Sequence, residues 1–184
     1  MTQGAAAFPY LEQWQHRLEI SKGNSIAVTF NDTRGADCTS TVRQLYRNVH
    51  GFIIMCDITN LASLRNIPAW LAQIEQAADV TAGRQVCVLV NKIETLLLDE
   101  AASESAQDGV EIADTALDQL AKLLRKRHPG VKLYEVSVKH GFSVQESIGA
   151  FGKGLASSRD LFIRQRFLQT LQRDQSIRYS NASN

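Results

Sequence analysis

The stretch from His50 to Asn60, HGFIIMCDITN, decides how the rest of the chain is interpreted. Its centre, Phe52 to Cys56, is a continuous apolar run. Such runs are typical of strands that are buried on both faces of a parallel sheet. The run stops at Asp57, so the stretch predicts an interior parallel strand with a polar tip.

Segments further along the chain alternate in type. Residues 66–78, NIPAWLAQIEQAA, have apolar side chains at helical spacing, with Asn66 able to cap the helix and Pro68 in its first turn. Residues 84–94, RQVCVLVNKIE, predict a second buried strand. An amphipathic helix over 112–130 and a third strand within 131–141 follow. Strands that alternate with helices indicate an α/β fold with a mostly parallel sheet.

The two ends of the chain depart from this alternation. Residues 17–30, RLEISKGNSIAVTF, give two extended runs around a Lys-Gly-Asn turn and predict an antiparallel hairpin. Residues 144–175 predict one long helix or two consecutive helices. Residues 99–109, DEAASESAQDG, look like a mobile surface insertion. We expect about five strands, in the order hairpin, 52–56, 85–90 and 131–136.

Composition limits the classes of function. The length of 184 residues suits a single domain, and 44% hydrophobic residues are enough for one core. Twenty basic and nineteen acidic side chains leave a formal charge of +1, which argues against nucleic-acid partners and anionic membranes. Three cysteines (Cys38, Cys56, Cys87) lack metal-ligand spacing and indicate a reducing, cytoplasmic compartment. We expect no membrane anchor, because no apolar run is long enough to span and the last residues, RYSNASN, offer no cysteine to prenylate.

Polar side chains gather where the predicted strands end. Ligands of such sheets bind outside the carboxyl ends of the strands. These tips carry Asp32-Thr33-Arg34-Gly35, Asp57, Asn91-Lys92-Ile93-Glu94 and Ser137-Val138-Lys139. Each motif alone also fits an ordinary turn or strand end, in roughly two cases of three. All of them in this order are much harder to obtain by chance.

Taken in this order, the tips resemble the Ras superfamily, and HGFIIMCDITNLASLRNIPAWLAQIE is most similar to its Rab branch. The resemblance spans about residues 13 to 165 and implies a three-layer α/β fold with an antiparallel edge hairpin and an extended C-terminal helix. Asp32 and Gly35 match the DxxG motif, whose aspartate helps to hold Mg²⁺. The resemblance therefore makes Asp32 a vestigial metal ligand.

The resemblance also implies a guanine site. Asn91 and Lys92 match the NKxD motif, while Glu94 replaces the aspartate that pairs with two ring N–H groups. Ser137, Val138 and Lys139 match the SAK motif except at the middle residue. We expect a degenerate base site, because the extra methylene of Glu94 displaces its carboxylate.

The departures from the family concern the phosphates. Family members place a strand, a GxxxxGK[ST] loop, a helix and a Mg²⁺-binding threonine before the hairpin, so the first strand and first helix are missing from the expected fold. Gly149 to Gly154, GAFGKG, lacks the spacing of that loop and falls in the last predicted helix. Ala36 stands where the family keeps a water-orienting glutamine. Losing about four charge-assisted hydrogen bonds would weaken binding by about 6–12 kcal/mol, so we expect no GTP hydrolysis and no catalytic residue.

The missing strand leaves alternatives open. Either the hairpin pairs directly with 52–56, or another polypeptide fills the gap, or the natural protein has an upstream phosphate loop. We favour a Rab-like pseudo-GTPase that needs no cofactor and serves as an interaction module in a larger assembly, with a ciliary or cytoskeletal site suggested by analogy. The alternative is a guanine-nucleotide switch that binds GTP or GDP with Mg²⁺ after completion by missing residues or by a partner.

The expected organisation is an N-terminal extension (1–12), an incomplete G domain (13–156), and a C-terminal helical extension with a tail (157–184). We expect a protein partner on two surfaces. One is the sheet face left bare by the missing helix. The other is the apolar stripe of the extension, unless that stripe folds back on its own domain. The residues of this stripe are Leu161, Phe162, Phe167, Leu168 and Leu171.

Overall fold

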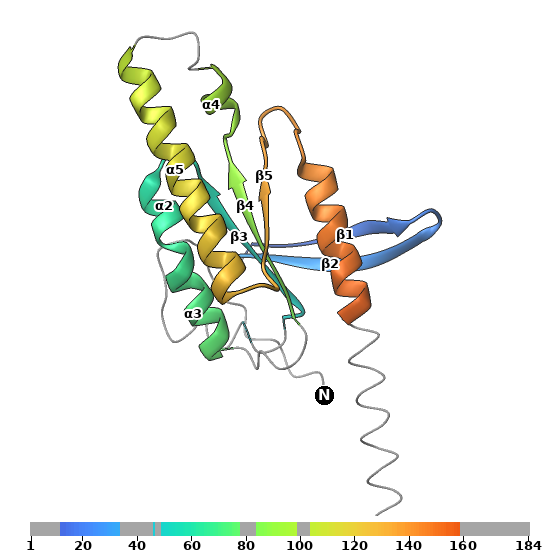
Figure 1. The fold of residues 1–184 in the computed structure, drawn as a ribbon. Coiled ribbons are helices and arrows are strands. Elements are labelled where there is room, and N and C mark those ends of the chain that lie inside the picture. The colour runs from blue at the N-terminus through green and yellow to red at the C-terminus, as the bar shows by residue number, and fades with distance from the viewer. Residues whose placement is uncertain (1–11, 34–45, 47–48, 78–83, 99–103, 159–184) are drawn as a thin grey trace, which may run out of the picture.

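The computed structural model describes residues 12–33, 46, 49–77, 84–98 and 104–158. Three strands form a parallel sheet: β3 (Gly51–Asp57), β4 (Gln85–Asn91) and β5 (Lys132–Glu135). Figure 1 shows α2 (Leu61–Arg65), α3 (Ile67–Ala77) and α5 (Glu104–Arg127) on one face of this sheet. A last helix, described over 144–158, lies on the other face, so the predicted layered α/β fold is confirmed.

The apolar strands serve two cores because successive side chains of a strand point to opposite faces. Cys56, Val88 and Val90 are buried against α2, α3 and α5. Cys87 and Leu89, together with Val136, are buried against the last helix. Burying each side chain of this kind stabilises the fold by roughly 1.5–3 kcal/mol. The continuous apolar runs in the sequence therefore correspond to burial on both faces, as expected.

Glycines bring the last helix close to the strands. A Cβ atom at Gly51 would lie 2.6 Å from Phe151 Cζ and 3.0 Å from the backbone oxygen of Gln85. A Cβ atom at Gly152 would lie 3.2 Å from Leu18 Cδ1, and one at Gly154 would lie 2.5 Å from Gln85 Oε1. The glycine-rich segment thus lies in a helix, as predicted, and two of its glycines allow close packing.

The start of the α2–α3 pair differs from the prediction. Asn60 caps α2, with its Oδ1 accepting from the Ala62 N–H at 3.1 Å. Asn66, predicted to cap the following helix, instead ends α2 in a helical conformation with φ −81° and ψ −12°. Its carbonyl accepts from the Trp70 N–H at 3.1 Å, so α3 continues almost directly from α2. The short α2 lacked a long enough apolar period to be recognised in the sequence.

Helix α5 begins earlier than predicted. It starts at Glu104, so residues 104–109, taken for part of a surface insertion, are helical. The remaining residues of that insertion, 99–103, lie outside the described residues. Alanine, glutamate and glutamine favour helix even where no apolar period marks it, which is why the prediction was wrong there. A five-residue helix, α4 (Glu94–Leu98), follows β4 directly.

The hairpin is present but does not join the sheet. Strands β1 (Glu12–Ser21) and β2 (Asn24–Asp32) pair antiparallel, and the turn between them contains Gly23 at φ +80°, where glycine is the favoured residue. The two strands form a separate sheet, so the predicted order with the hairpin next to β3 is wrong. Ile26 and Val28 of β2 pack instead on the core beneath the last helix. These apolar contacts hold the hairpin away from the β3 edge.

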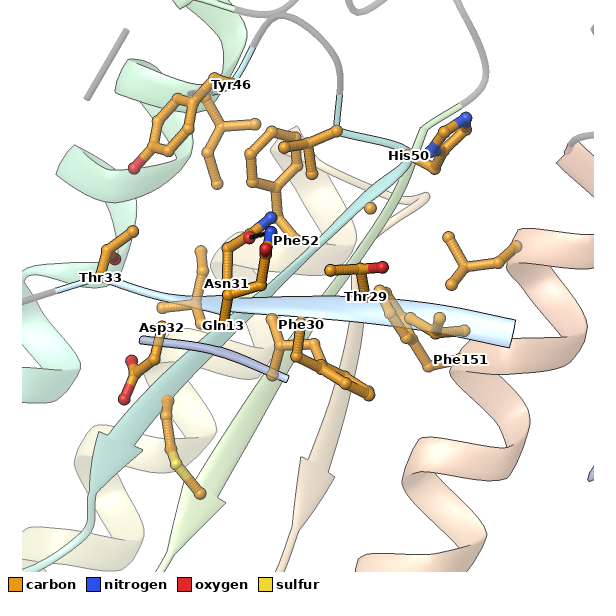
Figure 2. Close-up of a pocket in the computed structure, with 18 of the residues that line it drawn as sticks. Gln13, Thr29, Phe30, Asn31, Asp32, Thr33, Tyr46, His50, Phe52 and Phe151 are labelled. Carbon is orange, nitrogen blue, oxygen red and sulfur yellow. Dashed lines mark hydrogen bonds between the residues drawn. The ribbon is translucent and has the colours of Figure 1, made fainter. Parts of the chain in front are cut away.

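A hollow of about 1020 Å³ lies between the hairpin and β3. Figure 2 shows β2 crossing in front of β3, with Phe151 from the last helix on one side of the hollow. Tyr46 meets Phe52 edge to face, with ring centroids 5.0 Å apart. The hollow lies between the hairpin and β3, where the resemblance to the Ras superfamily places the missing first strand.

Two further properties concern the described part of the chain. None of its helices is both long and apolar enough to cross a membrane. Cys56 and Cys87 are buried free thiols in β3 and β4, and burial raises the pKa of each to about 12. Neither thiol is therefore a nucleophile at neutral pH.

Candidate functional site

The predicted base-reading residues meet at the carboxyl ends of the strands. β3 and β4 end side by side, with Asp57 paired to Asn91 in the register of the parallel sheet. The segment after β5 joins them through the Val136 N–H, which donates to the Val90 carbonyl at 2.8 Å. The fold thus brings three stretches, distant in sequence, to one edge of the sheet.

Asn91 fixes the loop that follows β5. Its Oδ1 accepts a hydrogen bond from the Val138 N–H at 3.0 Å. Ser137 is buried and exchanges backbone hydrogen bonds with Phe142, which closes the loop into a tight turn. The side chains of Val138 and Phe142 remain exposed on this turn. The Asn-Lys and Ser-Val-Lys motifs therefore lie together at one edge of the sheet, and their role in binding a base stays a prediction.

Lys92 forms an ion pair that the motif did not predict. Its Nζ lies 2.6 Å from Asp57 Oδ2, and its backbone has a left-handed φ of 67°. Asp57 Oδ1 also accepts from the N–H of Thr59 at 2.9 Å and from its hydroxyl at 2.6 Å. Asp57 was recognised as a strand tip but not as a site residue. The parallel register, which places it opposite Asn91, is the signal that could have identified it.

Glu94 begins α4 beside this pair. Its Oε2 atom is shielded from solvent and has no hydrogen-bond partner among the described residues. The hydroxyl of Ser137 holds the pKa of this carboxyl below its usual value, so the group is ionised at neutral pH. A shielded carboxylate oxygen without a donor is uncommon in folded proteins, and it offers an acceptor to a ligand that carries N–H groups.

Asp32 belongs to a different sheet from these residues. It ends β2, is exposed, and borders the hollow beneath the hairpin. Figure 2 shows its carboxylate directed away from Phe52 and Phe151. In the described part of the chain, no cluster of three or more histidine, cysteine, aspartate or glutamate side chains could hold a metal. The role of Asp32 as a vestigial metal ligand stays a prediction.

Several predicted residues fall outside the described ranges. They are Gly35 and Ala36 of the DxxG region and the whole apolar stripe of the C-terminal extension, Leu161, Phe162, Phe167, Leu168 and Leu171. Their roles stay predictions.

The Asp57 ion pair predicts a specific dependence of stability on pH. Burial alone would raise the pKa of Asp57, but hydrogen bonds from Lys92 and Thr59 outweigh it and lower the pKa below 3.8. A lowered pKa stabilises the fold above 3.8, and this contribution is lost as the pH falls through the folded-state pKa. Because both side chains are partly exposed, we expect Asp57→Asn to reduce stability at pH 7 by about 1 kcal/mol or less.

Thermal unfolding between pH 7 and pH 3 tests this expectation. The difference between the native chain and Asp57→Asn should shrink at the acid end. The matched control is Asp114→Asn, at an exposed position of α5. An equal loss for both variants at every pH would contradict the role of the ion pair.

Comparison with known proteins agrees with this arrangement. The family model described as "Ras family" matches residues 10–155. The GTP-binding protein YPTM1 of Zea mays is 24% identical over 139 residues, which cover 75% of this chain and 58% of that protein. The Ras-related protein Rab-13 of Bos taurus is 27% identical over 135 residues, covering 73% of this chain and 58% of that protein.

A second plant protein is similar to this chain over a comparable stretch. The Ras-related protein RABD2b of Arabidopsis thaliana is 27% identical over 129 residues, covering 70% of this chain and 55% of that protein. The chain spans slightly more than half the length of these curated relatives. The family model covers most of the chain, including every strand tip of the base site. Together with the parallel sheet and its tips, this match shows that the chain belongs to the Ras family and is similar to its Rab-type members.

Proposed function

We propose that this chain is a Rab-like protein-interaction module that does not hydrolyse GTP. The observation that carries the proposal is Ala36, which directly follows the Asp32–Gly35 motif. In GTPases of this type a glutamine at that point orients the attacking water. A methyl group can neither accept from a water molecule nor donate to it, so the chain's own residue offers no help to hydrolysis.

The geometry around Asp32 supports the same proposal. Its carboxylate is exposed at the end of a hairpin that forms its own sheet, whereas Asn91 and Lys92 lie at the tip of a strand in the other sheet. A metal ion that bridges nucleotide phosphates needs ligands placed to a few tenths of an ångström. Lys92 is in addition held by Asp57. The residues retained from the family are thus used in part for contacts within the fold.

An apolar docking surface supports an interaction role. The hollow beside β3 is bordered by apolar side chains from both helical layers and by Met55, which is 56% exposed. Apolar side chains that are exposed together in a hollow are a feature of interaction sites. We therefore propose that the protein works in a stable assembly with a protein partner, and that the apolar stripe over 161–171 adds a second contact.

A second candidate function rests on Glu94. Its shielded, unpaired Oε2 lies beside Ser137 and could accept from a guanine ring, with Asn91 nearby. This observation favours a guanine-nucleotide-binding switch whose phosphate site is completed from elsewhere. Both functions belong to the same family, and they differ in whether nucleotide binds tightly.

Calorimetry with GDP and with GTP, each with and without Mg²⁺, separates the two functions. We expect the 184-residue chain to bind no tighter than about 1 mM and to release no phosphate from GTP. Micromolar, Mg²⁺-dependent binding would overturn the proposal and favour the switch.

Two variants sharpen this measurement. Ala36→Gln restores the water-orienting side chain, and under the proposal it leaves phosphate release at background. For a nucleotide-binding switch, Ala36→Gln would instead raise turnover, and Glu94→Ala would weaken nucleotide binding by about tenfold or more because a charged hydrogen bond is lost. Lys126→Ala, at an exposed position near the end of α5 and outside the predicted base site, is the matched control for protein quality.

A further inference from the structure

Helix α5 separates its charges along its length. Every acidic residue of the helix lies before Gln119, and every basic residue lies after it. We call the basic residues of this helix and the one that begins β5 the basic end of the molecule: Lys122, Arg125, Lys126, Arg127 and Lys132. The stretch that holds them, KLLRKRHPGVK over 122–132, contains no acidic residue. The formal charge of +1 for the whole chain therefore conceals a strongly basic region.

The side chains of the basic end are exposed and lack acidic partners. All of them are exposed to solvent. The ion pairs among the described residues are Lys92–Asp57 and His128–Glu75, so no carboxylate in that part of the chain neutralises the basic end. Like charges that stand within about 10 Å of one another repel. An anion from outside the chain would relieve this repulsion.

Helix stability explains only part of the cluster. Cations at the C-terminus of a helix complement its dipole, but the effect falls off within the last turn. Arg125 fits this role, because its Nε donates to the Ala121 carbonyl at 3.2 Å. Lys122 lies more than one turn before the end of α5 at Arg127, and Lys132 lies beyond the helix. The dipole accounts for neither of these two lysines.

The basic end lies at the amino edge of the parallel sheet, opposite the base site. The turn after α5 is closed by the Val131 N–H, which donates to the His128 carbonyl at 2.9 Å, and β5 begins directly after it. Figure 1 shows α5 beginning near α4, which follows the tip of β4, and ending at the other end of the sheet. A ligand at the basic end would therefore leave the base site uncovered.

The chain leaves the described part at the same edge. Ser158 Oγ accepts a hydrogen bond from Gln85 Nε2 at 2.8 Å, and Gln85 begins β4. The sequence that follows over 159–173, RDLFIRQRFLQTLQR, contains four arginines and one aspartate. The sequence thus adds basic residues directly after the point at which the described chain reaches this edge.

We propose that the basic end docks on the anionic headgroups of a membrane surface. Its shape favours this ligand among polyanions, because it is the end of a helix and a turn with exposed Pro129 and Gly130, and none of its residues borders the hollow. Acidic peptides are usually bound in grooves. Single-stranded nucleic acid stacks on exposed aromatic rings, and residues 112–135 expose none. A projecting group of cations meets a flat layer of headgroups without needing a pocket.

Local charge decides this interaction, and net charge does not. The charge of the whole chain argued against an anionic membrane as a partner, but attraction to a surface is screened beyond about 10 Å. Only the residues that face the surface therefore contribute. Each lysine or arginine close to an anionic membrane strengthens binding by about fivefold.

Co-sedimentation of the 184-residue chain with lipid vesicles tests the proposal. One set of vesicles consists of phosphatidylcholine alone, and the other contains roughly one third phosphatidylserine. We expect binding to the anionic vesicles to be at least about tenfold stronger than to the neutral ones. High salt should abolish the difference, because it screens exposed charges.

Paired variants tie the effect to the basic end. Lys122→Glu together with Lys126→Glu should weaken binding to the anionic vesicles by about 25-fold or more, since two attractive charges become repulsive. Arg17→Glu together with Lys22→Glu changes the net charge equally at exposed positions of the hairpin and should alter binding by about twofold or less. Lys122→Arg together with Lys126→Arg keeps the charge and should bind as the native chain does. Thermal unfolding checks that each variant is folded.

Three results would overturn the proposal. Equal loss in both charge-reversed pairs would show that net charge alone matters. Equal binding to neutral and anionic vesicles would remove the electrostatic contact. Stronger binding of a glutamate-rich peptide or of single-stranded RNA at the same salt would remove the assignment to lipid. Vesicle binding is measured without nucleotide, so GTP turnover would overturn the proposed function and leave this inference standing.

Discussion

Leu124→Ala should lower the free energy of unfolding by about 2–5 kcal/mol, whereas Ile112→Ala on the same helix should change it by about 0.5 kcal/mol or less. Both residues belong to α5 and lose a similar number of carbon atoms. Leu124 is 2% exposed in the core beneath the sheet, and Ile112 is 53% exposed. Removing Leu124 leaves a cavity among packed side chains, while Ile112 already contacts water.

Urea or thermal unfolding of the 184-residue chain measures this difference, with all variants in the same state of assembly. A comparable loss for the two variants would show that α5 does not pack on the sheet through Leu124. A soluble, fully folded Leu124→Ala protein with unchanged stability would have the same meaning.

Gly51→Ala should destabilise the fold by about 1–3 kcal/mol through overpacking. The added methyl would lie 2.6 Å from Phe151 Cζ and 2.8 Å from Leu155 Cδ2, both on buried side chains, and 3.0 Å from the Gln85 backbone oxygen. Backbone and buried side chains cannot move aside without disturbing the contact of the last helix with β3.

Gly149→Ala is the matched control for this substitution. Gly149 lies in the last helix, and a Cβ atom there would meet nothing within 4 Å. Alanine at a helical position should instead stabilise by about 0.5–1 kcal/mol. Opposite signs for the two glycine substitutions are therefore expected. Destabilisation by both would contradict the open surroundings of Gly149.

The sequence predicted the parts of the fold that local patterns control. Apolar runs at 52–56 and 85–90 identified β3 and β4, and the polar tips of the strands indicated that Asn91 and the loop at Val138 would lie at one edge of the sheet. The early start of α5 at Glu104 was missed because that stretch has helix-forming residues without an apolar period.

Long-range pairing was harder to predict. Half-buried positions alternate along β2, but such a pattern does not show whether that face contacts a strand edge or the core beneath the last helix. The ion pair between Lys92 and Asp57 depends on the register of two strands, which no single motif encodes. Sequence patterns of this kind report which side of an element is buried, and not what lies against it.

The edge of β3 that no described strand pairs with also makes the state of the protein depend on its concentration. A molecule whose β3 edge is unoccupied presents an apolar strand to any other unoccupied molecule, and unprotected edges of this kind promote aggregation between copies. Association between copies rises more steeply with concentration than folding of a single copy does. Overproduction of this chain would therefore be expected to raise the aggregated share of the protein rather than the folded share.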